Sequence, residues 1–435
     1  MLLLKIALAI MFLLFAGSYL RWHPFFALLL TAVGLGFAVG LSGSAILETL
    51  RAGFGGLIGS VGLLIVLGSI IGVALERSGA TRRIAEALLG RGSAPGLRLA
   101  VLGAVIAVPV FCDSGFIILA SLLPAVALRA GVRVAPLALS LAGGLYLTHT
   151  LVPPTPGPLA AAANLGASDY VGTIMLLGTI VAIPTVLVTW WASGWLGRTV
   201  DAKPPGDVAR TDDPQPSLLR SSLPLLVPIL LIGLGSILAL TVDVTSGPAA
   251  FVAWWTSPTV ALTLGCVPAL LLPGRTDKSE WISAGLTLAG PILIITGLGG
   301  AFGAILKASS LADDVAGWVG EEPLSGVTLL LLGFGIAALM KTAQGSSTGA
   351  LVIASGVVAP LIPLAGFTAA TDLALLTLAI GGGAMTVSHA NDSYFWVVSR
   401  FSGIEVTDAY RSYTPLTAVM GVTVLLVVLV IYGVS

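Results

Sequence analysis

Apolar segments, most of about 20 residues, recur along almost the whole chain, and a helix needs about that length to cross the hydrocarbon core of a bilayer. The pattern predicts membrane spans at residues 2–20, 25–46, 54–75, 134–162, 167–197, 223–241, 250–273, 280–306, 370–400 and 413–434. Two further apolar stretches, 99–131 and 324–365, are interrupted near the middle by FCDSGF and KTAQGSSTG. The pattern indicates an all-α polytopic membrane protein.

The composition supports this class. Only 9% of the residues are charged and 57% are hydrophobic, whereas an ordinary soluble domain carries about 25% charged residues. The longest clearly polar stretch, the linker 198–222, is too short to hold a soluble catalytic domain. A net charge of zero gives no reason to expect a nucleic acid partner. Two cysteines far apart in the sequence predict neither a disulfide framework nor a metal site, and we expect no cofactor.

Charged loops orient the first half of the chain. The loop 76–98 contains five arginines and the linker 198–222 contains four lysines and arginines, so both are expected in the cytoplasm. An even number of crossings must separate them, and the spans 134–162 and 167–197 supply two. The stretch 99–131 must then enter and leave on one side, as a re-entrant hairpin with Asp113 near its tip.

The second half gives the same arrangement with the opposite orientation. The acidic loop 307–323 suits the outer face, so the stretch 324–365 is expected to enter as a hairpin from outside. Each half, 1–197 and 223–435, then holds three spans, a re-entrant hairpin and two spans, one of them broken. SGFIILAS resembles TGALVIAS, and LAGGLYLTH resembles IGGGAMTVSH, as a duplication would produce. Inverted repeats of this kind are typical of secondary transporters.

Four polar clusters lie within these apolar surroundings, at residues 112–115, 148–158, 344–349 and 388–396. Irregular backbone at membrane depth survives only where protein or water surrounds it, which favours a shared interior site. The prolines of PPTPGP cannot continue a helix. The N-termini of broken helices carry partial positive charge and suit a carboxylate, while nearby Ser, Thr, Asn and Gln can bind hydroxyl groups. The clusters therefore predict a site for a small polyhydroxylated anion.

The first cluster contains a carboxyl group that is costly in a membrane, about 2.5–3.5 kcal/mol on insertion scales. Burial favours the neutral form of such a group, which would let Asp113 take up and release protons near neutral pH. We therefore expect Asp113 to couple transport to protons, with Asp392 and His389 as further candidates. Lys341 could be the counter-charge for the substrate or for Asp113.

Simpler interpretations exist for each group. Asp113 could cap the following helix without titrating, and His149 and His389 could only fix the broken helices by hydrogen bonds. Lys341 could extend its amino group to an interface. The prolines of 153–158 could form an external turn.

The clusters resemble the signature segments of the gluconate:proton symporter (GntP) family of permeases. The resemblance runs in register from about residue 20 to the end and rests on FCDSGFIILASLLP, SLAGGLYLTHTLVPPTPGPLAAAANLGAS, KTAQGSSTGALVIASGVVAP and GGGAMTVSHANDSYFWVVSRF. It implies proton-driven import of sugar acids, the inverted-repeat fold of the ion transporter superfamily, and a homodimer formed through the scaffold spans. Two departures are Cys112-Asp113-Ser114 in place of a bulkier segment that often contains Glu, and Lys341 where arginine is frequent.

The clusters and the resemblance together give the expected site. The residues expected to bind substrate are Ser114, Gly115, His149, Thr150, Pro154, Gly157, Lys341, Gln344, Gly345, Ser346, Ser347, Thr348, His389 and Asn391. The motif prolines Pro153 and Pro156 accompany them, and Asp113, Asp392 and His389 are the expected proton-coupling groups.

These expectations describe a secondary transporter of a bacterial inner membrane that imports a small hydroxylated carboxylate by proton symport with alternating access. One alternative is a sodium-coupled carrier of carboxylates or hydroxy amino acids, because hairpin tips with Ser, Thr and exposed carbonyl groups can hold sodium. A remote alternative is an intramembrane hydrolase that uses Ser114 or Ser346 with His149 or His389. A hydrolase has no need for two mirrored halves.

Overall fold

The computed structural model describes residues 22–89, 94–120, 122–202, 216–241, 247–274, 277–309, 324–390 and 392–434, with single positions between residues 5 and 20. Most of the predicted span 2–20 and residues 203–215 of the predicted linker lie outside the described residues. The described ranges are helical, with one isolated β-bridge between Ala202 and Ile404.

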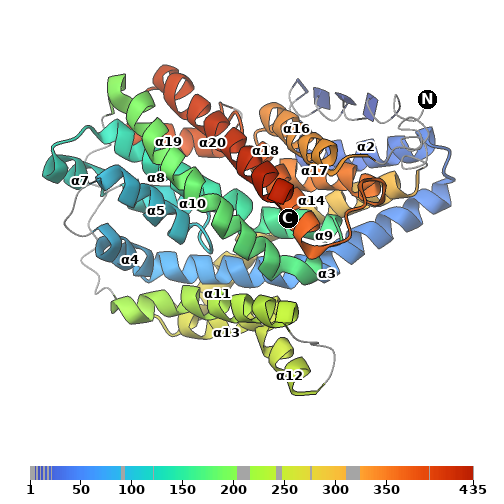
Figure 1. Cartoon of the computed structure of the whole chain (residues 1–435), viewed down its shortest axis with the longest axis horizontal. Helices are drawn as coiled ribbons and strands as arrows, with labels where there is room; N and C mark the ends of the chain where they lie inside the picture. The colour runs from blue at the N-terminus through green and yellow to red at the C-terminus, as the bar shows by residue number, and fades with distance from the viewer. Residues whose placement is uncertain are drawn as a thin grey trace.

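The helices follow the apolar segments (Figure 1). Those of the first half are α2 (Pro24–Ala38), α3 (Gly43–Arg77), α4 (Ala80–Leu89), α5 (Pro95–Ile106), α6 (Cys112–Ala120), α7 (Leu123–Ala130), α8 (Val134–Leu151), α9 (Pro156–Asn164) and α10 (Val171–Leu196). Those of the second half are α11 (Leu218–Thr241), α12 (Gly247–Thr256), α13 (Pro258–Leu270), α14 (Lys278–Lys307), α16 (Gly326–Gln344), α17 (Ser347–Val358), α18 (Ala370–Met385), α19 (Ser393–Ser402) and α20 (Val406–Val434).

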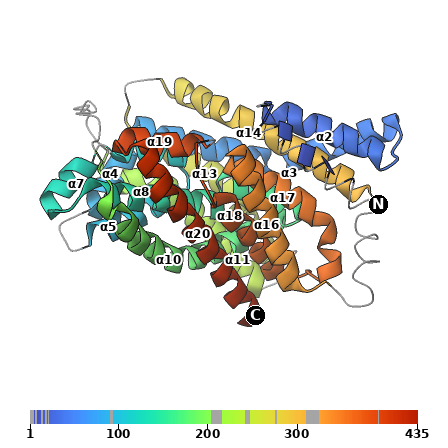
Figure 2. The ribbon, with the colours of Figure 1, turned by 90° about the horizontal axis from the view of Figure 1, so that it is seen from above.

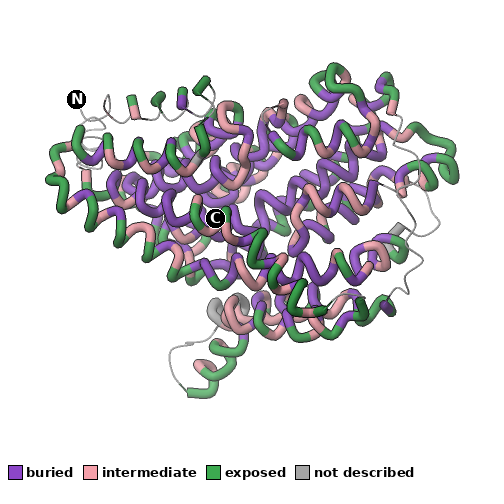
Figure 3. The backbone as a smooth tube through the Cα atoms, turned by 180° about the vertical axis from the view of Figure 1, so that it is seen from behind, coloured by how far each residue is buried: buried purple, intermediate pink, exposed green. Residues whose placement is uncertain are grey.

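Within the described ranges, seven helices are long and apolar enough to cross a membrane, or up to nine if each bent pair forms one span. Large apolar side chains stay exposed on outer faces, for example Ile183 and Trp191 of α10 and Leu426 of α20. Figure 3 shows the buried residues running through the middle of the molecule. The predicted class, an all-α polytopic membrane protein, is confirmed.

The structure corrects several predicted boundaries. The predicted boundary between the spans 25–46 and 54–75 is wrong. Helix α2 already ends at Ala38, and α3 begins at Gly43, within the first of the two predicted spans. Gly40 adopts a positive φ of 91°, a conformation that favours glycine, and the Ser42 side chain accepts a hydrogen bond from the Ala45 N–H and so caps α3.

Two predicted segments contain structure that the pattern did not reveal. The predicted loop 76–98 includes the amphipathic helix α4, which buries Ile84 and Ala85 and turns Arg82 outward. The predicted span 250–273 bends by 51° where Pro258 begins α13. Proline fixes its own φ and disfavours helical backbone at the preceding residue, so a bend at this point follows from the sequence.

The longest helix pair, α3 and α14, forms an antiparallel scaffold that also contacts α2 (Figure 2). The two backbones approach so closely that a Cβ added at Gly53 would lie 2.5 Å from the Gly300 carbonyl oxygen. Close approach through small residues is the usual basis of helix association in membranes.

Both interrupted stretches contain pairs of helices, and both predicted broken spans contain breaks. In the first half α5 and α6 flank residues 107–111, and α8 and α9 flank residues 152–155. In the second half α16 and α17 flank residues 345–346, and α18 and α19 flank residues 386–392. The re-entrance of the hairpins, their inverted relation and the repeat boundaries stay predictions.

Each hairpin is joined to the broken helix of its own half by a glycine contact. Helix α5 packs on α8 where Gly144 faces the Ala100 backbone, and α16 packs on α18 where Gly383 faces the Phe334 carbonyl group. These glycines belong to the two similar segments LAGGLYLTH and IGGGAMTVSH. The similar sequences thus perform the same packing task in both halves.

This contact gives a stability prediction. In Gly144→Ala the new methyl group would meet the Ala100 backbone, which cannot move aside as a flexible side chain could, so overpacking should cost about 1–3 kcal/mol. The midpoint temperature of unfolding in detergent should fall. Gly194→Ala on α10 is the control, because a Cβ there meets nothing within 4 Å. Equal midpoints for the two variants would contradict this account.

Candidate functional site

The N-termini of four short helices meet inside the bundle. Helix α17 packs on α9 in parallel, because Gly157 lies against Thr348 and Leu351, and Asn164 donates a hydrogen bond to the Val352 carbonyl oxygen. Helix α6 packs on α19, where the rings of Phe116 and Tyr394 lie 6.2 Å apart. All four helices therefore begin near a common centre.

An ion pair joins these elements at the centre. The Lys341 Nζ atom at the end of α16 lies 2.6 Å from the Asp392 Oδ2 atom, and the two side chains are 0% and 6% exposed. Lys341 also donates a hydrogen bond to the Gly345 carbonyl oxygen, which precedes α17. The counter-charge of Lys341 is therefore Asp392, rather than Asp113, and its amino group does not extend to an interface.

Asp392 is held from several sides. Its Oδ1 atom accepts a hydrogen bond from the Tyr394 N–H at 3.1 Å, so the carboxylate caps α19. Its Oδ2 atom accepts another from the Ser388 hydroxyl group. The residue thus combines a structural role at the helix end with a charge that neutralises Lys341.

Three buried polar atoms near this centre have no hydrogen-bond partner among the described residues: Asp113 Oδ1, His149 Nδ1 and Gln344 Oε1. The hydroxyl groups of Tyr146 and Tyr413 lie beside Ser347 and Ser388. Asp113 and His149 interact electrostatically with Asp392 and Lys341. The Tyr146 ring lies 5.4 Å from the Lys341 ammonium group. Buried polar groups in native proteins are nearly always bonded to protein or water, so this group of atoms points to a ligand or water position.

Backbone groups add donors to the same centre. In α9, Pro156 and Pro158 lack an N–H, and the Leu159 N–H bonds to Thr155, which leaves the Gly157 N–H without a helical partner. In α17, the Ser346 hydroxyl group accepts from the Gly349 N–H, and the N–H groups of the first turn, Ser347 and Thr348, have no intrahelical acceptor. Such N–H groups suit a carboxylate.

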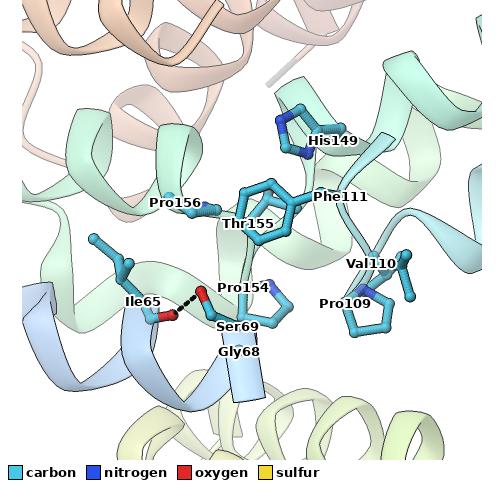
Figure 4. A pocket seen from close by; sticks show the side chains of 11 residues that line it. Ile65, Gly68, Ser69, Pro109, Val110, Phe111, His149, Pro154, Thr155 and Pro156 are labelled. Carbon is cyan, nitrogen blue, oxygen red and sulfur yellow. Dashed lines mark hydrogen bonds between the residues drawn. The ribbon is translucent and has the colours of Figure 1, made fainter. Parts of the chain in front are cut away.

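Figure 4 shows a narrow pocket between the first hairpin and the break of α8, lined by Phe111, His149, Pro154 and Pro156. The ring centres of Phe111 and His149, which line this pocket, lie 5.7 Å apart. The cavity volume of about 10 Å³ suffices for at most one water molecule. This pocket is therefore too small for a substrate in this conformation.

The other predicted residues have more ordinary positions. Thr150 donates its hydroxyl proton to the Tyr146 and Leu147 carbonyl groups of its own helix. Gly115 packs against Leu145, and Gly345 ends α16 with a φ of 80°. Ser114 lies beside the Glu76 carboxylate at the end of α3.

The third histidine, His389, reaches the ion pair through its backbone, because its carbonyl oxygen accepts a hydrogen bond of 2.8 Å from the Asp392 N–H. Its side chain points to another group. The His389 Nε2 atom lies 2.9 Å from the Thr342 carbonyl oxygen, and its ring stacks on Tyr410 at 6.5 Å. Asn391 lies outside the described residues.

The sequence reasoning missed three aromatic residues of the centre. The rings of Tyr146 and Tyr394 lie 5.3 Å apart, and those of Tyr394 and Tyr413 lie 6.0 Å apart. Each is at most 2% exposed. Tyr146 stands within the glycine-rich segment before His149, and Tyr413 stands between Ser412 and Thr414, so both positions carried a polar signal that could have been used.

Residues 345–349 fit the letters Gly-x-Ser-x-Gly of a hydrolase elbow, with Ser347 at the centre. That elbow joins a strand to a helix, whereas these residues join helices α16 and α17. Among the described residues, no group of three or more His, Cys, Asp or Glu side chains is arranged to hold a metal ion.

Broken helices that face one another within a bundle of spanning helices, around a buried ion pair, define a membrane transporter. Comparison with known proteins gives the particular family. Residues 1–434 match the model of a protein family that is described as "GntP family permease". The chain belongs to the GntP family of permeases.

Related proteins agree with this assignment. An uncharacterized permease of Haemophilus influenzae is 33% identical, over 91% of this chain and 85% of the relative. A gluconate permease of Pseudomonas aeruginosa is 31% identical, over 94% of this chain and 92% of the relative. The crystal structure of the Alcanivorax borkumensis YdaH transporter shares the fold, with a TM-score of 0.66 at 19% identity, and covers 94% of this chain and 97% of that one.

These findings make the chain a multi-pass permease of the bacterial inner membrane and reject the hydrolase alternative, because the relatives are permeases.

The ion pair gives a second prediction. Lys341→Met or Asp392→Asn alone would leave an uncompensated buried charge, at a cost of about 3–5 kcal/mol. The double variant removes both charges while the asparagine can still cap α19. Its unfolding midpoint should therefore lie well above the value expected from adding the two single losses, and simple additivity would contradict the pairing.

Proposed function

We propose that this permease imports a small hydroxylated carboxylate, such as gluconate or a related sugar acid, by proton symport with alternating access. The observation that carries the proposal is the Lys341–Asp392 pair, with Asp113 beside it, at the meeting point of four helix N-termini.

The donors at the centre favour a carboxylate as the charged part of the substrate. Lys341 offers an ammonium group, and the Gly157, Ser347 and Thr348 N–H groups lie at positive helix ends. The hydroxyl groups of Tyr146 and Tyr413, which lie beside Ser347 and Ser388, can bind substrate hydroxyl groups. The related gluconate permease of Pseudomonas aeruginosa supports the same substrate class.

The charges of the centre favour coupling to protons. Among the described side chains here, one ammonium group faces two carboxyl groups, Asp392 and Asp113. A substrate carboxylate would add a third negative group in a medium where uncompensated charge is costly. Uptake of a proton by Asp113 or Asp392 offsets the added charge, and protonation of Asp392 would also release Lys341 to bind the substrate.

The packing favours alternating access. Each hairpin and its broken helix share backbone contacts at Gly144 or Gly383, while α3 and α14 pack closely on each other and also contact α9 and α17. Movement of the hairpins and broken helices against α3 and α14 would open the centre to each side in turn. A homodimer, as the family resemblance implies, stays a prediction.

The proposal is tested with purified protein in lipid vesicles and labelled gluconate. An inward proton gradient should drive accumulation in the wild type and in Asp201→Asn, which alters only an exposed surface pair with Arg133. Asp113→Asn should still exchange labelled for unlabelled substrate but should not accumulate it. Full gradient-driven accumulation by Asp113→Asn would show that the coupling role is wrong.

The same assay separates the coupling ions. Replacement of sodium by choline should leave accumulation unchanged, because the proposal assigns the compensating positive charge to a proton on Asp113 or Asp392. Loss of accumulation in choline would favour the sodium-coupled alternative.

A further inference from the structure

A second cavity lies away from the central ion pair. It lies between α3 and α14 on one side and the C-terminal ends of α9 and α17 on the other, and the labels of these four helices stand close together in Figure 1. Its volume is about 280 Å³, compared with about 10 Å³ for the pocket beside His149. Small-molecule sites usually measure about 300–1,000 Å³, so this cavity lies close to the lower end of that range.

Missing side chains create the space. Gly53 and Gly56 of α3, Gly300 and Gly303 of α14, and Gly356 of α17 line the cavity. A Cβ added at Gly56 would meet nothing within 4 Å, so the space beside α3 is open. At its edge Gly303 and Gly356 approach so closely that a Cβ on the first would lie 3.3 Å from the Cα of the second.

The polar lining suits a hydroxylated anion. Lys307, at the exposed C-terminal end of α14, is the charged group of the lining, which contains no acidic residue among those the structure describes. Ser60, Asn164 and Ser168 supply hydroxyl and amide groups. Asn164 is 7% exposed and fixed, because its Nδ2 atom donates hydrogen bonds of 3.0 Å to the Val352 carbonyl oxygen and to the Ser355 hydroxyl group.

The cavity lies on a direct line to the central site. Helices α9 and α17 begin at the centre and end at the cavity, and Gly157 and Asn164 mark the two ends of α9. At a rise of about 1.5 Å per residue, the two positions are about 10 Å apart. The predicted topology places the end of α14 at the outer face, so the cavity opens to the outside.

We propose that this cavity is an outer binding site, in which Lys307 holds the carboxylate of the substrate before the substrate reaches the centre. Ser60, Asn164 and Ser168 bind its hydroxyl groups. The inference rests on the proposed function, because it takes the substrate to be a hydroxylated carboxylate that enters from outside.

Uptake kinetics in right-side-out vesicles test the site. Lys307→Gln should raise the KM for gluconate by about tenfold, should leave the maximal rate unchanged, and should flatten the dependence of KM on salt. Lys307→Arg should restore the wild-type KM. The matched control is Arg51→Gln, which removes an exposed positive charge from the same end of α3 outside the cavity. An equal rise of KM in Arg51→Gln, or no rise in Lys307→Gln, would overturn the proposal.

Thiol labelling tests the site without requiring transport. In Ser60→Cys, a negatively charged methanethiosulfonate added from outside should react faster than a positively charged one, and gluconate should protect the thiol. Lys307→Glu should reverse the preference. The parent protein supplies the blank, since Cys112 and Cys266 are buried. Failure of all uptake would count against the proposed function, whereas equal labelling by both reagents without protection would overturn the outer site.

Discussion

Charge and open backbone inside a membrane protein must find partners within the protein, because lipid offers none. In this permease the Lys341–Asp392 pair meets that requirement at one point. Lys341 ends α16 and bonds the Gly345 carbonyl oxygen ahead of α17, while Asp392 caps α19. A buried pair adds little net stability, since desolvation offsets the attraction, but removal of one partner is costly. The pair therefore fixes how the second hairpin meets its broken helix, and the remaining elements of the site are arranged around it.

Glycine contacts hold the other helices of the bundle close together around the ion pair. Gly144 and Gly383 join each hairpin to the broken helix of its half, and the Gly53–Gly300 contact holds α3 against α14. Where glycines face space, as at Gly56, the same composition leaves the outer cavity open. The close helix contacts and the open outer cavity thus both depend on glycines along helix faces.

The sequence predicts the architecture because each rule it uses acts locally. Hydrophobic length identifies the spans, and proline and polar clusters mark the interruptions at 152–155, 345–346 and 386–392. Prediction from the sequence fails where a feature depends on contact with an element far along the chain. The partner of Lys341, Asp392, is 51 positions away, whereas the sequence analysis offered only the substrate or Asp113 as its counter-charge. The roles of Tyr146 and Tyr413, and the cavity at Lys307, arise from packing between the two halves, which no local pattern contains. The short amphipathic α4 was missed because its arginines were interpreted only as topology signals.

The most direct test of the central claim is an experimental structure of the protein with bound gluconate at acidic pH. The account predicts that the substrate carboxylate lies within hydrogen-bond distance of the Lys341 amino group and of the N-termini of α9 and α17, with Asp392 moved away from Lys341. A bound substrate elsewhere in the molecule, with the Lys341–Asp392 pair intact, would contradict it.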